Sequence, residues 1–239
     1  MTKGRPGADS SDLVTSQIGG RSLLDLATET FGEKPTFWGR YFTSAATTGL
    51  VEYRQLKEGQ VLRDQNIRVL PIARQTKRVA GTSAQGTADA KLNAKDVLLT
   101  FRGDYLKSLG GKFLMFLDVE STPPLALSYY KGWASTLSDY SQTLSKGDVT
   151  LLPCVYGVQS DNVTWRAIAT AADQGVACDG VWIARWKWRG CHPVPPWNAA
   201  AVTPSASGFR VIFGNGDRAG RDCSLHDETF SSSNESISS

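Results

Sequence analysis

The chain has 239 residues, of which 41% are hydrophobic and 21% charged, and its formal net charge is +3. This length and composition predict one globular domain with a substantial core, and no apolar run approaches the roughly 20 residues that span a bilayer. The small positive charge does not indicate a nucleic-acid-binding protein, because the basic cluster at 74–78 is short and lacks interleaved aromatic residues. The first residues contain no hydrophobic stretch typical of a signal peptide. A mature form without its leader would look the same, so the compartment stays open. A secreted or cell-envelope protein is favoured.

Segments 1–20 and 231–239 are rich in Ser, Gly and Thr and predict flexible tails on either side of a domain at 21–230. Within the domain, short apolar segments alternate with helical patterns. The predicted strands are 22–26, 36–42, 68–73, 113–120, 150–157, 180–184 and 209–213. The predicted helices are 52–66, 86–109, 125–144 and 164–173. Strands separated by helices favour right-handed βαβ units and a parallel sheet.

Two architectures fit this alternation, an open doubly wound sheet and a closed barrel. No GxGxxG segment follows the first predicted strand and no GxxxxGK[ST] segment occurs, so the phosphate-binding open folds lose support. Polar residues recur where the predicted strands end, and in a barrel these ends meet at one mouth. We therefore predict an α/β fold with a single (β/α)8 TIM-like barrel, regular or irregular.

The most informative segment is 113–120, Phe-Leu-Met-Phe-Leu-Asp-Val-Glu. Its five consecutive apolar residues predict a strand that is buried on both faces. Asp118 and Glu120 follow at positions i and i+2, so they share one face, with Cα atoms roughly 6.5–7 Å apart. Two close acids at a buried strand end push their pKa values apart, as acid–base chemistry requires. The structural alternative is that these acids are only solvated or cap the next helix.

Several short motifs follow one another in a distinctive order. They are Phe37-Trp38-Gly39-Arg40-Tyr41-Phe42, Leu117-Asp118-Val119-Glu120, Tyr129-Tyr130-Lys131-Gly132-Trp133, Val155-Tyr156-Gly157 and Trp182-Ile183-Ala184-Arg185-Trp186. Together, over residues 20–228, they resemble the bacterial glycoside-hydrolase-like domain of unknown function, a relative of the family 25 lysozymes. The resemblance implies a (β/α) barrel with carboxylates at its mouth. For the lysozyme relatives it also implies cleavage of the peptidoglycan glycan between N-acetylmuramic acid and N-acetylglucosamine.

The same resemblance implies roles for four acids. Glu120 corresponds to the general acid, and Asp118 to the partner that positions or polarises the acetamido group of the substrate. A third acid ends the first strand of the family, where this chain offers Asp25, and a fourth lies near the last strand, where it offers Asp222. Leu24 stands where the family carries Gly before the third acid, and the segment around Asp222 matches loosely.

Five further residues are candidates for substrate contact. Tyr156 follows an apolar strand, so its hydroxyl group either bonds a sugar or a carboxylate or belongs to the core. Trp186 and Trp188 lie at and beyond the end of the sixth predicted strand, where aromatic faces suit pyranose rings. Arg40 and Arg74 end the second and third predicted strands. Each either pairs with a carboxylate such as Asp118, binds an anionic substrate group, or forms a structural ion pair.

The four cysteines lie far apart without a CxxC pair, and the chain has two histidines, so we predict neither a metal site nor a cofactor. Two functions remain. The first is a muramidase-like, retaining glycoside hydrolase that acts on the peptidoglycan polysaccharide. The alternative is a non-catalytic glycan-binding or adaptor module of a cell-wall-associated system. A polyanion binder using the 74–78 cluster ranks last, and the oligomeric state is not predicted.

Overall fold

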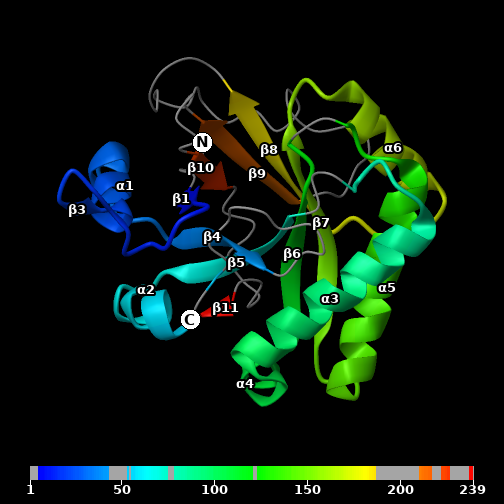
Figure 1. Cartoon of the computed structure of the whole chain (residues 1–239), viewed down its shortest axis with the longest axis horizontal. Coiled ribbons are helices and arrows are strands. Elements are labelled where there is room, and N and C mark those ends of the chain that lie inside the picture. Colours follow the sequence, from blue (N-terminus) through cyan, green and yellow to red (C-terminus); the bar gives the residue numbers. More distant parts are fainter. Residues whose placement is uncertain are drawn as a thin grey trace.

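The computed structural model describes residues 5–42, 53, 55–74, 78–120, 123–186, 210–216, 222–226 and 237–238. They form an α/β fold in which a curled sheet lies between two groups of helices (Figure 1). In that view α1 and α2 lie on the left of the sheet, α3, α5 and α6 lie on the right, and α4 lies at the bottom. Among the described residues, no helix is both long and apolar enough to cross a membrane.

The main sheet contains strands from both ends of the chain. Its members are β1 (Arg5–Asp9), β4 (Phe37–Phe42), β5 (Arg68–Arg74), β6 (Lys112–Asp118), β7 (Thr150–Val158), β8 (Gly180–Trp186), β9 (Arg210–Gly216), β10 (Asp222–His226) and β11 (Ile237–Ser238). Their spatial order is β11-β5-β4-β1-β10-β9-β8-β7-β6, and β5 pairs with β6 as well. The ladder between β5 and β6 is parallel and brings the two sides of the curled sheet together. A separate hairpin consists of β2 (Gln17–Ile18) and β3 (Arg21–Ser22).

Most neighbouring strands of the main sheet run parallel, from β1 through β4, β5, β6, β7 and β8 to β9. Strands β10 and β11 are the exceptions, because β10 runs antiparallel to both β1 and β9, and β11 runs antiparallel to β5. The helical elements are α1 (Leu23–Phe31), the π-helix η1 (Gln55–Gly59), α2 (Gln60–Asp64), α3 (Ser83–Phe101), α4 (Gly103–Ser108), α5 (Leu127–Ser145) and α6 (Asn162–Asp173). The α/β class and the curled parallel sheet agree with the expected barrel. A regular eightfold alternation of strand and helix is not shown by the described residues.

Strands β4 to β9 lie where the apolar runs predict them, and the helices differ more. The expected strand at 22–26 is wrong, because a helix begins at Leu23 with Ser22 as its N-cap. The expected helix at 86–109 is two helices, separated by Arg102, whose φ of 61° interrupts the helical backbone. The expected tail at 1–20 contains β1, which pairs with β4 and β10 inside the main sheet.

The alternation of side chains along the strands creates two hydrophobic clusters. The inner cluster contains Phe37, Tyr41, Leu70, Ile72, Leu114, Phe116, Cys154, Tyr156 and Trp182. The outer cluster contains the intervening residues, such as Trp38, Phe42, Met115 and Leu117, and packs under the helices. The segment 113–117 is therefore buried on both faces, as its apolar run predicts.

Candidate active site

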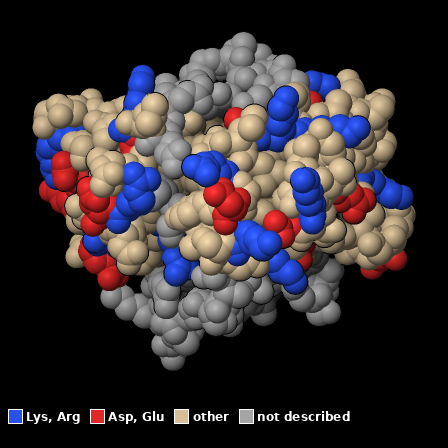
Figure 2. Space-filling model, turned by 90° about the horizontal axis from the view of Figure 1, so that it is seen from below, with Lys and Arg blue, Asp and Glu red and all other residues tan. Residues whose placement is uncertain are grey.

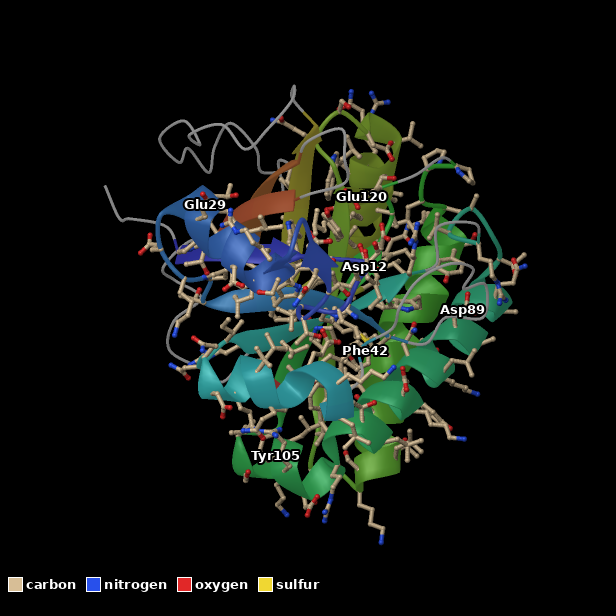
Figure 3. All side chains as sticks on the ribbon, turned by 60° about the vertical axis from the view of Figure 1, so that its left-hand side comes forward. Asp12, Glu29, Phe42, Asp89, Tyr105 and Glu120 are labelled. Atoms are coloured by element: carbon tan, nitrogen blue, oxygen red, sulfur yellow. The ribbon has the colours of Figure 1, made fainter. Side chains whose placement is uncertain are left out.

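The parallel strands bring polar residues together at their C-terminal ends. Asp9 is the last residue of β1, Arg74 the last of β5 and Asp118 the last of β6, while Tyr41 is the last but one of β4. Side chains at the carboxyl ends of neighbouring parallel strands meet at one edge of a sheet or barrel, where active sites of such folds lie. Glu120 lies two residues after the last residue of β6, and Figure 3 shows it in the upper part of the view, with Tyr105 of α4 in the lower part.

Asp118 is buried and is held from two directions. Its Oδ1 atom accepts a hydrogen bond from the backbone N–H of Glu120 at 3.1 Å, and its Oδ2 atom lies 3.8 Å from Nε of Arg74. Burial raises the pKa of Asp118 to about 6, while the Glu120 amide and the Arg74 guanidinium act in the opposite direction. This carboxyl group therefore changes its charge near neutral pH.

Glu120 is placed by the residue between the two acids. Val119 is buried in the outer cluster, and its backbone N–H bonds the carbonyl oxygen of Tyr156 at 2.7 Å. That bond ties the residue that follows β6 to β7, so the backbone directly before Glu120 is fixed. The Glu120 side chain is half-buried, whereas Asp118 is buried. Of the two acids, Glu120 is thus the one with access to a solvent-borne substrate.

Asp9 is a third acid at this edge, and none of the sequence motifs predicts it. The hydroxyl group of Tyr41 donates a hydrogen bond to Oδ2 of Asp9 at 3.2 Å. Burial raises the pKa of Tyr41 well above its usual range, and the charges of Asp9, Asp118 and Glu120 raise it further. Three acids thus act on one buried phenol. We call Asp9, Tyr41, Arg74, Asp118 and Glu120 the acid cluster.

Close packing fixes two members of the acid cluster. A Cβ atom on Gly39 would lie 2.7 Å from Cβ of Asp9 and 3.0 Å from Cη2 of Trp182, so a side chain at this position of β4 has no room. The guanidinium carbon of Arg74 lies 5.8 Å from the centre of the Tyr41 ring, which is a cation–π contact. The Arg74 side chain is 38% exposed, so its charge faces both the acids and solvent.

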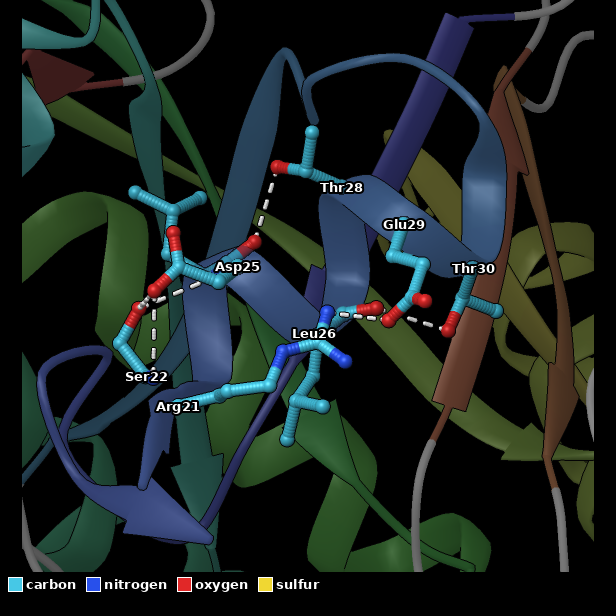
Figure 4. Close-up of polar contacts among 8 residues, drawn as sticks. Arg21, Ser22, Asp25, Leu26, Thr28, Glu29 and Thr30 are labelled. Carbon is cyan, nitrogen blue, oxygen red and sulfur yellow. Dashed lines mark hydrogen bonds and ion pairs between the residues drawn. The ribbon is translucent and has the colours of Figure 1, made fainter. Parts of the chain in front are cut away.

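The structure does not place Asp25 at a strand end. It lies in the first turn of α1, where its Oδ2 atom accepts hydrogen bonds from the backbone N–H and the hydroxyl group of Ser22 (Figure 4). These bonds lower the pKa of Asp25, which is exposed. The backbone N–H of Asp25 bonds Ser22 Oγ in return, which completes a capping box. Asp25 therefore has a helix-capping role, and Asp9 occupies the place at the end of the first strand.

Asp222 opens β10, and its Cα is paired with those of Asp9 and Gly216. Because β10 runs antiparallel to β1, its first residue lies beside the last residue of β1. The backbone therefore brings Asp222 to the same edge of the sheet as Asp9. The other acids predicted from the sequence, Asp25, Asp118 and Glu120, are not paired with a residue of β1.

The remaining predicted contacts divide into three groups. Arg40 lies on the outer side of β4, fully buried, with its Nε atom 3.0 Å from Oε1 of Glu58, so it does not join the acid cluster. Tyr156 is buried in the inner cluster, paired in register with Asp118 and with its ring 4.7 Å from that of Trp182. Trp186 is the last residue of β8, and Trp188 lies outside the described residues.

The described part of the chain contains no group of three or more His, Cys, Asp and Glu side chains that could hold a metal ion. On the face drawn in Figure 2, the described Lys and Arg side chains alternate with Asp and Glu side chains. This face therefore offers no extended basic surface to a polyanion.

No protein-family model and no curated protein matches the chain. Solved structures do match its fold. An uncharacterized protein of B. stearothermophilus has a TM-score of 0.64 at 20% identity, with 95% of this chain and 98% of that chain covered. The spore cortex lytic enzyme SleM of Clostridium perfringens has a TM-score of 0.54 at 16% identity, covering 94% and 67%. The catalytic domain of an endolysin from a bacteriophage of Listeria monocytogenes has a TM-score of 0.51 at 14% identity, covering 96% of both chains. These likenesses establish the fold that the chain shares with them.

Proposed function

We propose that this protein hydrolyses the glycan of bacterial cell-wall peptidoglycan in a muramidase-like, retaining reaction. The observation that carries the proposal is the acid cluster, in which Asp9, Asp118 and Glu120 gather around Tyr41 at the C-terminal end of the parallel strands. Two of the proteins with a similar fold are named as an endolysin catalytic domain and a spore cortex lytic enzyme, which supports the same class of substrate. The order of motifs that resembles the glycoside-hydrolase-like domain and the family 25 lysozymes supports it as well.

In the proposed reaction, Glu120 donates its proton to the glycosidic oxygen as the bond from that oxygen to the anomeric carbon breaks. The carbonyl oxygen of the substrate's own acetamido group attacks the anomeric carbon and forms a cyclic intermediate. Asp118 orients the acetamido group and balances its developing positive charge. Water then opens the ring from the opposite face while Glu120 takes up the proton of this water, so the anomeric configuration is retained overall.

Asp9 takes the role that the resemblance gives to the acid at the end of the first strand, in place of Asp25. Its hydrogen bond from Tyr41 fixes the carboxylate beside the other two acids. Asp222, paired in register with Asp9, is the fourth acid of the proposed site. Arg74 lies between the acids and solvent, and its charge favours the ionised form of Asp118 that the reaction requires. Trp186 and Trp188 remain proposed sugar platforms, whereas Arg40, which pairs with Glu58, and Tyr156, which lies in the inner cluster, are not proposed to contact the substrate.

The test is to incubate purified peptidoglycans of several wall types with the protein between pH 4 and pH 8. Loss of turbidity and release of reducing ends are expected with the wild-type protein, and neither with Glu120→Gln. Release of reducing ends by both proteins would assign the activity to other residues. Glycan binding that survives Glu120→Gln, without turnover by the wild type, would instead indicate the non-catalytic binding or adaptor module.

A further inference from the structure

A buried ion pair lies directly behind the acid cluster, on the outer face of β4. Arg40 and Glu58 are both fully buried, and Nε of Arg40 lies 3.0 Å from Oε1 and 3.1 Å from Oε2 of Glu58. Arg40 stands between Gly39, which packs against Asp9, and Tyr41, which hydrogen-bonds Asp9. Because side chains alternate along a strand, Tyr41 faces the acid cluster and Arg40 faces away from it.

The same ion pair holds the segment that follows Asp9. Nη1 of Arg40 donates a hydrogen bond to the carbonyl oxygen of Ser10, the residue next to Asp9. Oε2 of Glu58 accepts the backbone N–H of Val14 at 2.9 Å, four residues further along. Both ends of the 10–14 segment are thus bonded to one buried pair of charges. The backbone N–H of Ser10 adds a long bond of 3.4 Å to the carbonyl oxygen of Gly39.

A contribution to the stability of the fold does not by itself explain a buried ion pair of this kind. Taking two charges out of water costs several kcal/mol per ion, and well-packed apolar side chains in the same place are often as stable or more so. The acid of this pair also comes from η1, a π-helix, and short π-helical turns are rare in proteins and frequent at functional sites. A directional, charge-assisted network is suited to fixing the path of the backbone rather than to strengthening the core.

We infer that Arg40 and Glu58 are positioning residues that hold the carboxylate of Asp9 in the acid cluster by anchoring the backbone on its C-terminal side. The inference rests on the proposed function insofar as Asp9 takes part in the reaction. Arg40 and Glu58 are fully buried on the face of β4 that points away from the acid cluster, so they act through other residues. Their effect reaches Asp9 through Ser10 and through the strand that carries Tyr41.

The experiment compares the wild type with the double variant Arg40→Met/Glu58→Leu, which removes both charges and keeps the volume filled. The control is Lys107→Met/Asp148→Asn, which removes an exposed ion pair of 2.8 Å that precedes β6 and β7 and so lies at the other end of the strands. The first variant is expected to melt cooperatively but to lose on the order of 10- to 100-fold in kcat with little change in KM, because misplacing one group by about 1 Å is that costly. The control is expected to keep the wild-type kcat.

A second measurement separates this inference from the proposed function. The carboxyl 13C signal of Asp9 is recorded by NMR in each protein, and it should move in the Arg40/Glu58 variant and stay in place in the control. A folded variant with the wild-type kcat and an unmoved Asp9 signal would overturn the inference. If the double variant does not fold, Glu58→Gln takes its place with the same two readouts and the same criteria. A wild-type protein without turnover would contradict the proposed function, and the Asp9 signal alone would then decide the inference.

Discussion

Two parts of the molecule combine a buried acid with a tyrosine and an arginine, but they differ in the lengths of the contacts and in the number of acids. Between α3 and α5, Asp89 accepts the hydroxyl group of Tyr129 at 2.8 Å on one oxygen and pairs with Nη1 of Arg78 at 2.9 Å on the other. In the acid cluster, the corresponding contacts are longer, at 3.2 Å from Tyr41 to Asp9 and 3.8 Å from Arg74 to Asp118. One acid with short bonds to both oxygens is typical of a structural network, whereas several acids around one phenol are typical of a reactive site.

The surroundings of the two sites support the same distinction. Asp89 lies in the α3–α5 contact, where Gly86 packs against the backbone of Tyr129 and Gly132 against that of Ser83. The acid cluster lies at the ends of strands, with the half-buried Glu120 and the partly exposed Arg74 on its outer side. Substitutions in the first site should therefore change stability, and substitutions in the second should change activity.

The largest expected effect is that of Glu120→Gln on activity. Removing the proton donor should lower kcat on the order of 10² to 10⁴-fold, while the shape and the free energy of unfolding stay nearly unchanged. Rates of reducing-end release and urea denaturation curves measure the two quantities. A folded variant that hydrolyses glycan at the wild-type rate would remove Glu120 from the site.

The next effect distinguishes the two candidates for the acid of the first strand. Asp9→Asn should lower kcat by roughly 10²-fold or more, because the amide cannot replace a carboxylate among the reacting groups. Asp25→Asn should leave kcat unchanged and lower the stability only slightly, since it weakens a solvent-exposed capping box at the start of α1. If Asp25→Asn lowers kcat and Asp9→Asn does not, Asp25 and not Asp9 is the third acid of the site.

Asp89→Ala tests whether the site between α3 and α5 contributes to stability and not to activity. It deprives Tyr129 and Arg78 of their shared acceptor, and breaking a buried pair of this kind costs about 3 kcal/mol. Thermal denaturation should show the loss, and kcat measured well below the melting temperature should match the wild type. A selective loss of kcat at unchanged stability would assign Asp89 to function.

Asp118→Asn is expected to stabilise the protein at alkaline pH while lowering its activity. The pKa of Asp118 is raised to about 6 from 3.8, so its stabilising contribution is complete below the unfolded value and is lost as the pH rises through about 6. At pH 8 the wild type keeps a buried charge that the variant lacks, and the difference amounts to up to about 3 kcal/mol. Denaturation curves at pH 4 and pH 8 test this, since the advantage of the variant should shrink toward pH 4.

The sequence predicted the parts of the fold that depend on local pattern. Strands β4 to β9 can be recognised in the sequence by their apolar runs, because a buried strand requires several apolar residues in a row. The Asp118-Val119-Glu120 segment can be recognised because it follows one of these runs. Strand β1 has no such pattern, because its sequence, Arg5-Pro6-Gly7-Ala8-Asp9, contains three residues, Pro6, Gly7 and Asp9, of types that are rare in strands. Gly7 is nevertheless required there, since a Cβ atom would overlap the ring of Phe37. The partners of β1, β4 and β10, are distant in the sequence and give no local signal.

The place of α1 and the choice between the alternatives for Arg40 both had signals in the sequence. The Leu-Leu-Asp-Leu segment at 23–26 resembles a strand, but Ser22 and Asp25 are spaced as in a capping box, which marks the start of a helix. Arg40 and Tyr41 are adjacent in one strand, so only one of them can face the acid cluster. The aromatic residue faces inward because the inner cluster needs apolar volume, and the cation faces outward because η1 supplies Glu58.

The most direct test of the account is a crystal structure of Glu120→Gln soaked with a peptidoglycan fragment or a chitooligosaccharide. The account predicts a sugar at the C-terminal end of the parallel strands, with a glycosidic oxygen about 2.6–3.2 Å from the side chain at position 120 and the acetamido group against Asp118. Asp9 should line the same site and Asp25 should not. A glycan bound elsewhere on the molecule, with the acid cluster untouched, would contradict the account.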